Sequence, residues 1–214
     1  MDQDTASRLN YAYFELCAEG TRRILEEGFT PSRGGDISLR DPATGLIYIS
    51  AGLGDLPFPC SDFSEVKAPD PAVFTLDGRR LCGEKLATVE LPMHLAIFRA
   101  RSDVQCVLHI HAQWSTVFAM VHQDVPGYPL SDGLSEPYGR SCRISTASYA
   151  PAGAMEVGDY VVKALGDRPA AMLACHGAVA VGESMDRAFA NARLLEEMSL
   201  KSIYEIIFDR RMQT

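Results

Sequence analysis

The sequence predicts an α/β protein in which a mixed central sheet is sandwiched between helices. Segments with apolar residues at helical spacing alternate along the chain with short apolar runs that are typical of strands. Some of these runs are joined in pairs by turn sequences, which predicts hairpins and therefore antiparallel neighbours in the sheet. The chain has 214 residues and neither an internal repeat nor a linker-like stretch, so a single domain over residues 1–214 is expected.

The first half of the chain is expected to supply two helices and two hairpins. Gly28 follows a run of apolar residues at helical spacing, and the turn sequences DPATG and LDG each separate two strand-like stretches. Thr88 can cap the second helix, whose first turn tolerates Pro92. The expected ranges are helices at 5–27 and 88–101 and strands at 36–40, 46–50, 72–75 and 79–82.

The second half is expected to supply three more strands and three helices. A β-branched and apolar run that ends at His111 predicts a strand, and a long segment with Leu194 and Leu195 on its core side predicts the last helix. Residues 123–139 are rich in Pro and Gly and are expected to form a loop. The expected ranges are strands at 104–111, 143–146 and 170–175 and helices at 114–122, 153–165 and 184–208.

Composition and charge exclude several classes of protein. A formal net charge of −8 leaves no excess of Lys and Arg to neutralise nucleic-acid phosphates or an anionic membrane. No run reaches the roughly 18–20 apolar residues that a membrane-spanning helix needs, and the acidic N-terminus lacks signal-peptide features. The six cysteines form no CxxC pair, which is typical of a reducing compartment. We therefore expect a cytoplasmic protein whose partner is a small molecule.

Two histidines on one expected strand carry the first sign of chemistry. His109 and His111 are two residues apart, and side chains at this spacing lie on the same face of a strand. Neutral imidazole is a preferred ligand of zinc and similar ions, so the pair can supply half of a metal site. Two histidines on a polar sheet face, without a metal, are an alternative of about equal weight.

A third ligand would come from His94, His122 or His176. The spacing favours His176, which ends an apolar strand just before Gly177, where sites are commonly built in α/β folds. His94 lies in mid-helix among apolar residues and is expected to pack or to form a hydrogen bond there. His122 follows a helix end and can act as a cap. A metal held by three histidines keeps an open position for substrate or water.

Glu90 is the candidate acid/base for such a site. It lies in the first turn of the expected helix at 88–101, a short way before the strand that carries the two histidines. A bound cation can polarise a carbonyl or stabilise an enediolate, and this chemistry needs a group that accepts and donates a proton. The alternative is a carboxylate that only matches the dipole of its helix.

The chain resembles the class II aldolase and adducin family. This family includes fuculose-phosphate and rhamnulose-phosphate aldolases, ribulose-phosphate 4-epimerase, methylthioribulose-phosphate dehydratase and 3-oxotetronate-phosphate decarboxylase. The similar blocks follow one another in family order over nearly the whole chain. They are GDISLR from Gly35, ELPMH from Glu90, DVQCVLHIH from Asp103, CHGAV from Cys175, GES from Gly182, then Ala188 and LEE from Leu195.

The resemblance implies a fold, a cofactor and an assembly. The implied fold is a class II aldolase-like three-layer α/β/α sandwich. His109, His111 and His176 would bind a divalent cation, with Zn²⁺ favoured over Mn²⁺, Co²⁺ and Fe²⁺, and Glu90 would be the catalytic acid/base. The implied assembly is a homotetramer with active sites near the subunit interfaces.

The implied substrate pocket departs from the family pattern. Asp36 stands where relatives carry Asn, and Thr88 begins a TVE sequence where relatives carry Ser-Ser-Glu. Two like charges at 4 Å repel by roughly 1 to 4 kcal/mol, so Asp36 favours a substrate without phosphate. Phosphate binding through backbone amides is the alternative. The expected substrate-binding residues are Gly35, Asp36, Ser50, Gly52 and Thr88.

The expected reaction is carbon–carbon bond cleavage of the aldolase type. A retro-aldol step through a metal-stabilised enediolate would act on a small hydroxy-carbonyl or sugar-like compound. A decarboxylase of a hydroxy or keto acid is the main alternative, because the QWST sequence from Gln113 resembles that branch. A 4-epimerase and a non-catalytic adducin-like scaffold are further alternatives. Loop residues expected to complete the site are Tyr128, Asp132, Glu136 and Tyr138.

Overall fold

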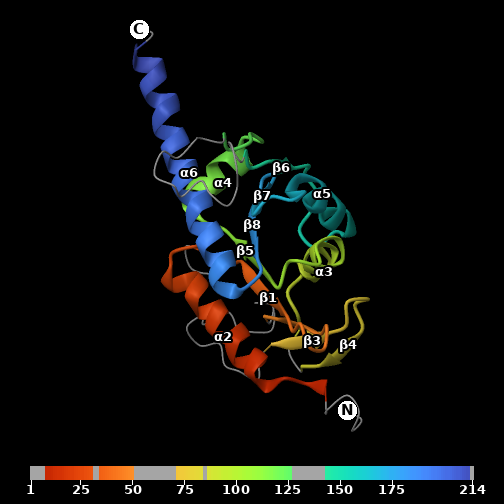
Figure 1. Ribbon diagram of the computed structural model, residues 1–214. Coiled ribbons are helices and arrows are strands. Elements are labelled where there is room, and N and C mark those ends of the chain that lie inside the picture. Colours follow the sequence, from red (N-terminus) through yellow and green to blue (C-terminus); the bar gives the residue numbers. More distant parts are fainter. Residues whose placement is uncertain (1–7, 31–33, 51–70, 84–85, 127–142, 213–214) are drawn as a thin grey trace.

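A mixed sheet with helices on both faces forms the body of the protein (Figure 1). The computed structural model describes residues 8–30, 34–50, 71–83, 86–126 and 143–212, with the side chains of 210–212 left aside. Within these residues the elements are α2 (Tyr11–Glu26), β1 (Asp36–Arg40), β2 (Ile47–Ile49), β3 (Ala72–Phe74), β4 (Arg80–Cys82), α3 (Leu91–Ala100), β5 (Cys106–Ile110), α4 (Gln113–Met120), β6 (Thr146–Ala147), α5 (Met155–Leu165), β7 (Ala170–Leu173), β8 (Gly177–Gly182) and α6 (Met185–Met212).

The sheet places β5 at its centre. Its strand order is β4-β3-β2-β1-β5-β8-β7-β6, and every neighbouring pair is antiparallel except β6 and β7. The single parallel pair is connected through α5, as parallel neighbours require a crossover. The prediction of a mixed sheet is therefore confirmed.

Two hydrophobic cores lie on opposite faces of this sheet. Leu108 and Ile110 of β5 pack in the core with α2, α4 and α6, whereas Val107 packs in the core with α3 and α5. Alternate residues of one strand thus serve different layers, as the pleat of a strand dictates. The predicted three-layer sandwich is confirmed, and the odd-numbered positions of β5 face the layer of α3 and α5.

The apolar run before α6 contains two strands where the sequence predicted one. Residues 170–175 were expected as a single strand, but β7 ends at Leu173 and β8 returns antiparallel to it from Gly177. The missed strand is GAVAVG, whose glycines and alanines have low strand propensity. The strand β8 lies between β5 and β7 with all of its residues buried, so burial outweighs propensity there.

Two further boundaries also differ from the expectation. The strand expected at 143–146 is reduced to β6, preceded by an isolated bridge between Val125 and Ile144. The helix expected from residue 5 begins at Tyr11, because the Asn10 side chain accepts a hydrogen bond from the Ala12 amide and caps it.

No helix among the described residues combines the length and the apolar character that crossing a membrane would require.

A carboxylate from the last helix fixes the start of α4. Glu196 on α6 accepts hydrogen bonds from the backbone amides of Trp114 at 2.9 Å and Ser115 at 2.7 Å. These are amides that a helix N-terminus leaves without an internal partner, and a negative charge there also suits the helix dipole. Because α4 starts directly after His111, this contact also anchors the end of the central strand.

Candidate metal centre

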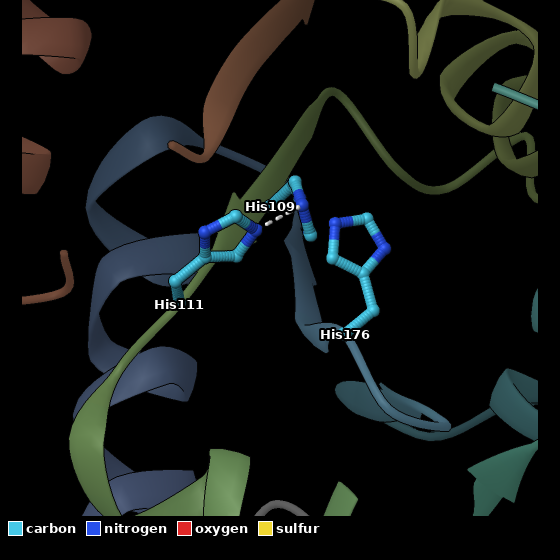
Figure 2. Close-up of side chains that lie close together, drawn as sticks. All are labelled: His109, His111 and His176. Atoms are coloured by element: carbon cyan, nitrogen blue, oxygen red, sulfur yellow. Dashed lines mark hydrogen bonds between the residues drawn. The ribbon is translucent and has the colours of Figure 1, made fainter. Parts of the chain in front are cut away.

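Three histidines from two parts of the sheet lie around one point (Figure 2). His109 lies on β5, His111 follows that strand directly, and His176 lies in the turn between β7 and β8. One ring nitrogen from each lies within 4.8 Å of the others, and the ring centroids are 4.8 to 5.0 Å apart. The structure thus brings together the three residues that the sequence favoured.

A backbone carbonyl sets the proton position on His109. Nδ1 of His109 lies 3.0 Å from the Ala178 oxygen on β8, and because a carbonyl only accepts, Nδ1 carries the proton. The other nitrogen, Nε2, is then left with a lone pair and lies 3.0 Å from Nε2 of His111. Metal-bound histidines commonly donate their second nitrogen in this way, so the arrangement fits a cation.

Glycines allow the backbone to approach the histidine rings closely. A Cβ at Gly34 would lie 2.4 Å from Nδ1 of His111, and one at Gly177 would lie 2.8 Å from Cδ2 of the same ring. At Gly35, where φ is +82°, a Cβ would lie 2.6 Å from the backbone oxygen of His109. Gly35 is therefore required by the packing of β1 against β5, which is a different role from the substrate contact that the sequence predicted.

Burial keeps the three imidazoles in the form that binds metals. Removal from water lowers the pKa of His109 to about 3, and the neighbouring imidazoles lower it further, against the opposing charge of Asp36. Burial also lowers the pKa of His111 and His176. A histidine must be neutral to donate a lone pair, so the cluster is ready for a cation at neutral pH without losing protons first.

Glu90 faces this cluster from the start of α3. Its side chain is 3% exposed, and Oε1 lies 4.0 Å from Nε2 of His176. Neither carboxylate oxygen makes a hydrogen bond of full geometry within the described part of the chain, although the Gly153 amide is close enough to lower the pKa of Glu90. Burial, and next the charge of Asp36, raise the pKa of Glu90 to about 7, so both protonation states are populated near neutral pH.

Asp36 is bound by the protein itself. Its side chain is buried, Oδ2 accepts a hydrogen bond from the Thr88 hydroxyl at 2.5 Å, and Oδ1 lies 2.6 Å from Nε2 of His94. Burial alone would raise the pKa of Asp36, but the His94 imidazole and the Thr88 hydroxyl lower it to about 2. The expected role of Asp36 and Thr88 in substrate binding stays a prediction, and within the protein the Thr88 hydroxyl already donates its proton to Asp36.

The remaining substrate candidates are placed only in part. Ser50 is buried, and its hydroxyl oxygen accepts a hydrogen bond from the Ile37 amide at 3.1 Å, so it extends the pairing of β1 with β2. Gly52 lies outside the described residues, as do the loop candidates Tyr128, Asp132, Glu136 and Tyr138.

The two other histidines have partners outside the cluster. Nδ1 of His94 lies 2.6 Å from the Ser38 hydroxyl oxygen, within hydrogen-bond distance. The prediction that His94 packs or forms a hydrogen bond within its helix layer is confirmed. His122 follows α4 with a φ of 54°, and its Nε2 lies 2.9 Å from Sγ of Cys175, whose φ is 58°. Sequence reasoning gave no sign of this contact, because it joins two residues that are far apart along the chain.

The fold and the site together define the class of protein. The chain belongs to the class II aldolase family: the family model for the class II aldolase and adducin N-terminal domain matches residues 15–200. A solved structure of an L-fuculose 1-phosphate aldolase has the same fold, with a TM-score of 0.79 and 24% sequence identity. That comparison covers 94% of this chain and 89% of the other.

Curated relatives include an aldolase and a decarboxylase. The chain is 28% identical over 183 residues to a 5-deoxy-D-ribulose 1-phosphate aldolase of Bacillus thuringiensis serovar kurstaki, covering 85% of this chain and 79% of the relative. It is also 28% identical over 184 residues to a 3-oxo-tetronate 4-phosphate decarboxylase of Escherichia coli O6:H1, covering 81% of this chain and 78% of the relative.

His109→Ala is expected to remove metal binding. The variant loses the buried central imidazole, and two histidines are too few for a stable site of this kind. Metal analysis after dialysis against Zn²⁺ should give about one ion per chain for the native protein and well under a tenth of that for the variant. His122→Ala is the control, since this exposed histidine lies outside the cluster and should leave the metal content unchanged. Full metal content in His109→Ala would contradict the site.

Glu90→Gln is expected to change the pH dependence of stability in the metal-free protein. The pKa of Glu90 is raised from 4.5 to about 7, so folding favours the protonated carboxyl. As pH rises from 4.5 to 7, the unfolded chain releases this proton first, and the native protein loses about 2 kcal/mol relative to Glu90→Gln. Urea unfolding at pH 4.5, 6 and 8 measures the difference.

The exposed Glu183→Gln is the control for this comparison. Comparing variants cancels the contribution of the buried histidines, which has the opposite sign: their lowered pKa values cost stability as pH falls below 6.5. Parallel stability curves for the native protein and Glu90→Gln would contradict the raised pKa of Glu90.

Proposed function

We propose that this chain is a divalent-metal-dependent carbon–carbon lyase of the aldolase type. The observation that carries the proposal is the convergence of three neutral imidazoles on one point, with the buried Glu90 carboxyl 4.0 Å from His176. The substrate is a small hydroxy-carbonyl or sugar-like compound, cleaved by a retro-aldol step. The names of the relatives, most of which are aldolases, support the same reaction class.

His109, His111 and His176 are proposed as the ligands of the cation, and Zn²⁺ is the ion that best suits three nitrogen donors. The bound cation would polarise the substrate oxygen and stabilise the negative charge that develops when the bond breaks. The protein contributes the arrangement of the ligands. The carbonyl of Ala178 holds the His109 ring, and the glycines at 34 and 177 let the backbone pack against His111.

Glu90 is proposed as the acid/base of the reaction. A general acid/base works best when its pKa is close to the operating pH, and the pKa of Glu90 is about 7. The only described group that acts on its carboxylate as a hydrogen-bond donor is the Gly153 amide, so the carboxylate keeps lone pairs available to exchange a proton with a bound molecule. Burial at 3% exposure keeps this proton transfer apart from bulk water.

We further propose that the substrate need not carry a phosphate group. The relatives are named for phosphate esters, but Asp36 in this chain is ionised, with a pKa lowered to about 2, and pairs in register with His109 across β1 and β5. A buried carboxylate next to the histidine cluster disfavours a phosphate dianion nearby. A neutral hydroxy-carbonyl compound does not meet this repulsion.

A decarboxylase is the second candidate, and the relative from Escherichia coli supports it at the same identity as the aldolase. Both reactions leave negative charge on a carbon next to a carbonyl, so the same three histidines would serve either of them. A 4-epimerase needs the same site. A non-catalytic scaffold would not need a buried carboxyl with a pKa near neutrality beside three neutral imidazoles, so we set it aside.

The proposed assembly is a homotetramer formed by single-domain chains in the cytoplasm. The far end of α6 extends beyond the body of the protein (Figure 1) and exposes apolar side chains, which supports a subunit contact there. These side chains are Tyr204, Ile206, Ile207 and Phe208. The cysteines among the described residues, Cys17, Cys82, Cys106 and Cys175, are free thiols, as a reducing compartment would maintain them.

Product analysis is expected to identify the reaction. The Zn²⁺-loaded protein should release an aldehyde from an aldol in a panel that pairs phosphorylated and free hydroxy-carbonyl compounds with β-keto acids. The kcat/KM for the best free compound should equal or exceed that for its phosphate ester, because of the Asp36 charge. Release of carbon dioxide without aldehyde would establish the decarboxylase instead. A strong preference for the phosphate ester would overturn the proposal about phosphate.

A further inference from the structure

One carboxylate holds the backbone on both sides of Glu90. Oδ2 of Asp36 accepts the hydrogen bond from Thr88, two residues before Glu90, and Oδ1 contacts the ring of His94, four residues after it. Thr88 in turn accepts a hydrogen bond from the Glu90 amide at 3.2 Å, and the His94 amide donates to the Glu90 carbonyl at 3.2 Å. Asp36 therefore brackets the turn that carries Glu90.

All members of this network are buried. Asp36 is 4% exposed, Thr88 is 8% exposed and His94 is fully buried. The Ser38 hydroxyl completes the chain of contacts at Nδ1 of His94, and Ser38 lies two residues after Asp36 on β1. The Thr88–Asp36 and Ser38–His94 hydrogen bonds are stronger in such surroundings than in water. The Asp36–His94 contact adds an ion-pair distance of 2.6 Å without hydrogen-bond alignment.

Asp36 also connects this turn to the metal centre. It lies opposite His109 in the antiparallel register of β1 and β5, on the face of the sheet that α3 covers. Asp36 and Ser38 of β1 thus hold the first turns of α3 near Glu90, whereas Arg40 of β1 contacts the far end of this helix at the Phe98 oxygen. Apart from the nearby Gly153 amide, which lowers its pKa, the Glu90 side chain has no hydrogen-bond partner among the described residues, so the backbone that carries it largely determines where it lies.

We propose that Asp36 is a positioning residue, which acts through Thr88 and His94 to hold the first turn of α3 so that Glu90 faces the three histidines. This role rests on the proposed function of Glu90 as acid/base. It differs from substrate binding, because both carboxylate oxygens already contact side chains of the protein. Displacing a catalytic group by about 1 Å can lower the rate about 100-fold. Losing the contacts of Asp36 with Thr88 and His94 is therefore expected to lower kcat.

The test compares Asp36→Asn and Thr88→Val with the native protein. Asn keeps the size of Asp but loses one acceptor oxygen, and Val keeps the shape of Thr but loses the hydroxyl proton. Both variants should exchange the backbone amides of residues 88–94 about tenfold faster in hydrogen-exchange mass spectrometry. Both should keep one metal ion per chain, and kcat should fall about 10- to 100-fold with KM within about threefold of the native value.

Two controls separate positioning from a general loss of stability. Thr88→Ser keeps the hydroxyl and should restore native exchange and native kcat. Asp41→Asn changes another buried aspartate, which follows β1 and accepts hydrogen bonds from Ala43 and Thr44 away from the site. It should lower the unfolding midpoint while leaving kcat and the exchange of residues 88–94 unchanged.

A double variant adds a third check. If Asp36 and Thr88 act through one contact, Asp36→Asn with Thr88→Val should lower kcat no further than the more damaging single variant. If the loss of kcat in the double variant equals the product of the two single losses, Asp36 and Thr88 do not act through one contact. If the exchange rate of residues 88–94 is unchanged, Asp36 does not hold this turn. A raised KM with native kcat would show a substrate contact instead. If the native protein lacks lyase activity but residues 88–94 still exchange faster in the two variants, the proposed function is wrong and the role of Asp36 in holding this turn is supported.

Discussion

The antiparallel register of β5 between β1 and β8 is the constraint on which the site depends. In this register His109 lies opposite Asp36 on one side and Val179 on the other. The same pairing places the Ala178 carbonyl against Nδ1 of His109 and lets Gly34 and Gly177 pack against the ring of His111. A shift by one residue would turn His109 to the opposite face of the sheet, where α2 and α6 pack.

Burial then gives the grouped side chains their chemical state. The same removal from water lowers the pKa of the histidines and raises that of Glu90, because in both cases it penalises the charged form. Asp36 is the exception, since contacts with His94 and Thr88 offset the cost of burying its charge. One buried charge thus remains beside the cluster, and it contacts residues on both sides of Glu90.

Local patterns predicted most of the fold, because most elements carry a local signal. The hairpin of β1 and β2, the helix α5 and the amphipathic α6 follow from spacing and turn residues. The strand β8 did not, because GAVAVG has few β-branched residues and is stabilised by its central position between β5 and β7. The contacts of Asp36 could not be predicted either, because its position in a motif does not show that His94 and Thr88 reach its oxygens.

The sequence by itself determined that His109 and His111 share one face of a strand, since a strand has a period of two residues. It also determined the family, through blocks that keep their order along the chain. Only the tertiary structure decided that the turn before β8 brings His176 to these two residues, and that Asp36 ties β1 to α3. These contacts join residues more than 50 positions apart, and they depend on strand register and helix packing that no local pattern specifies.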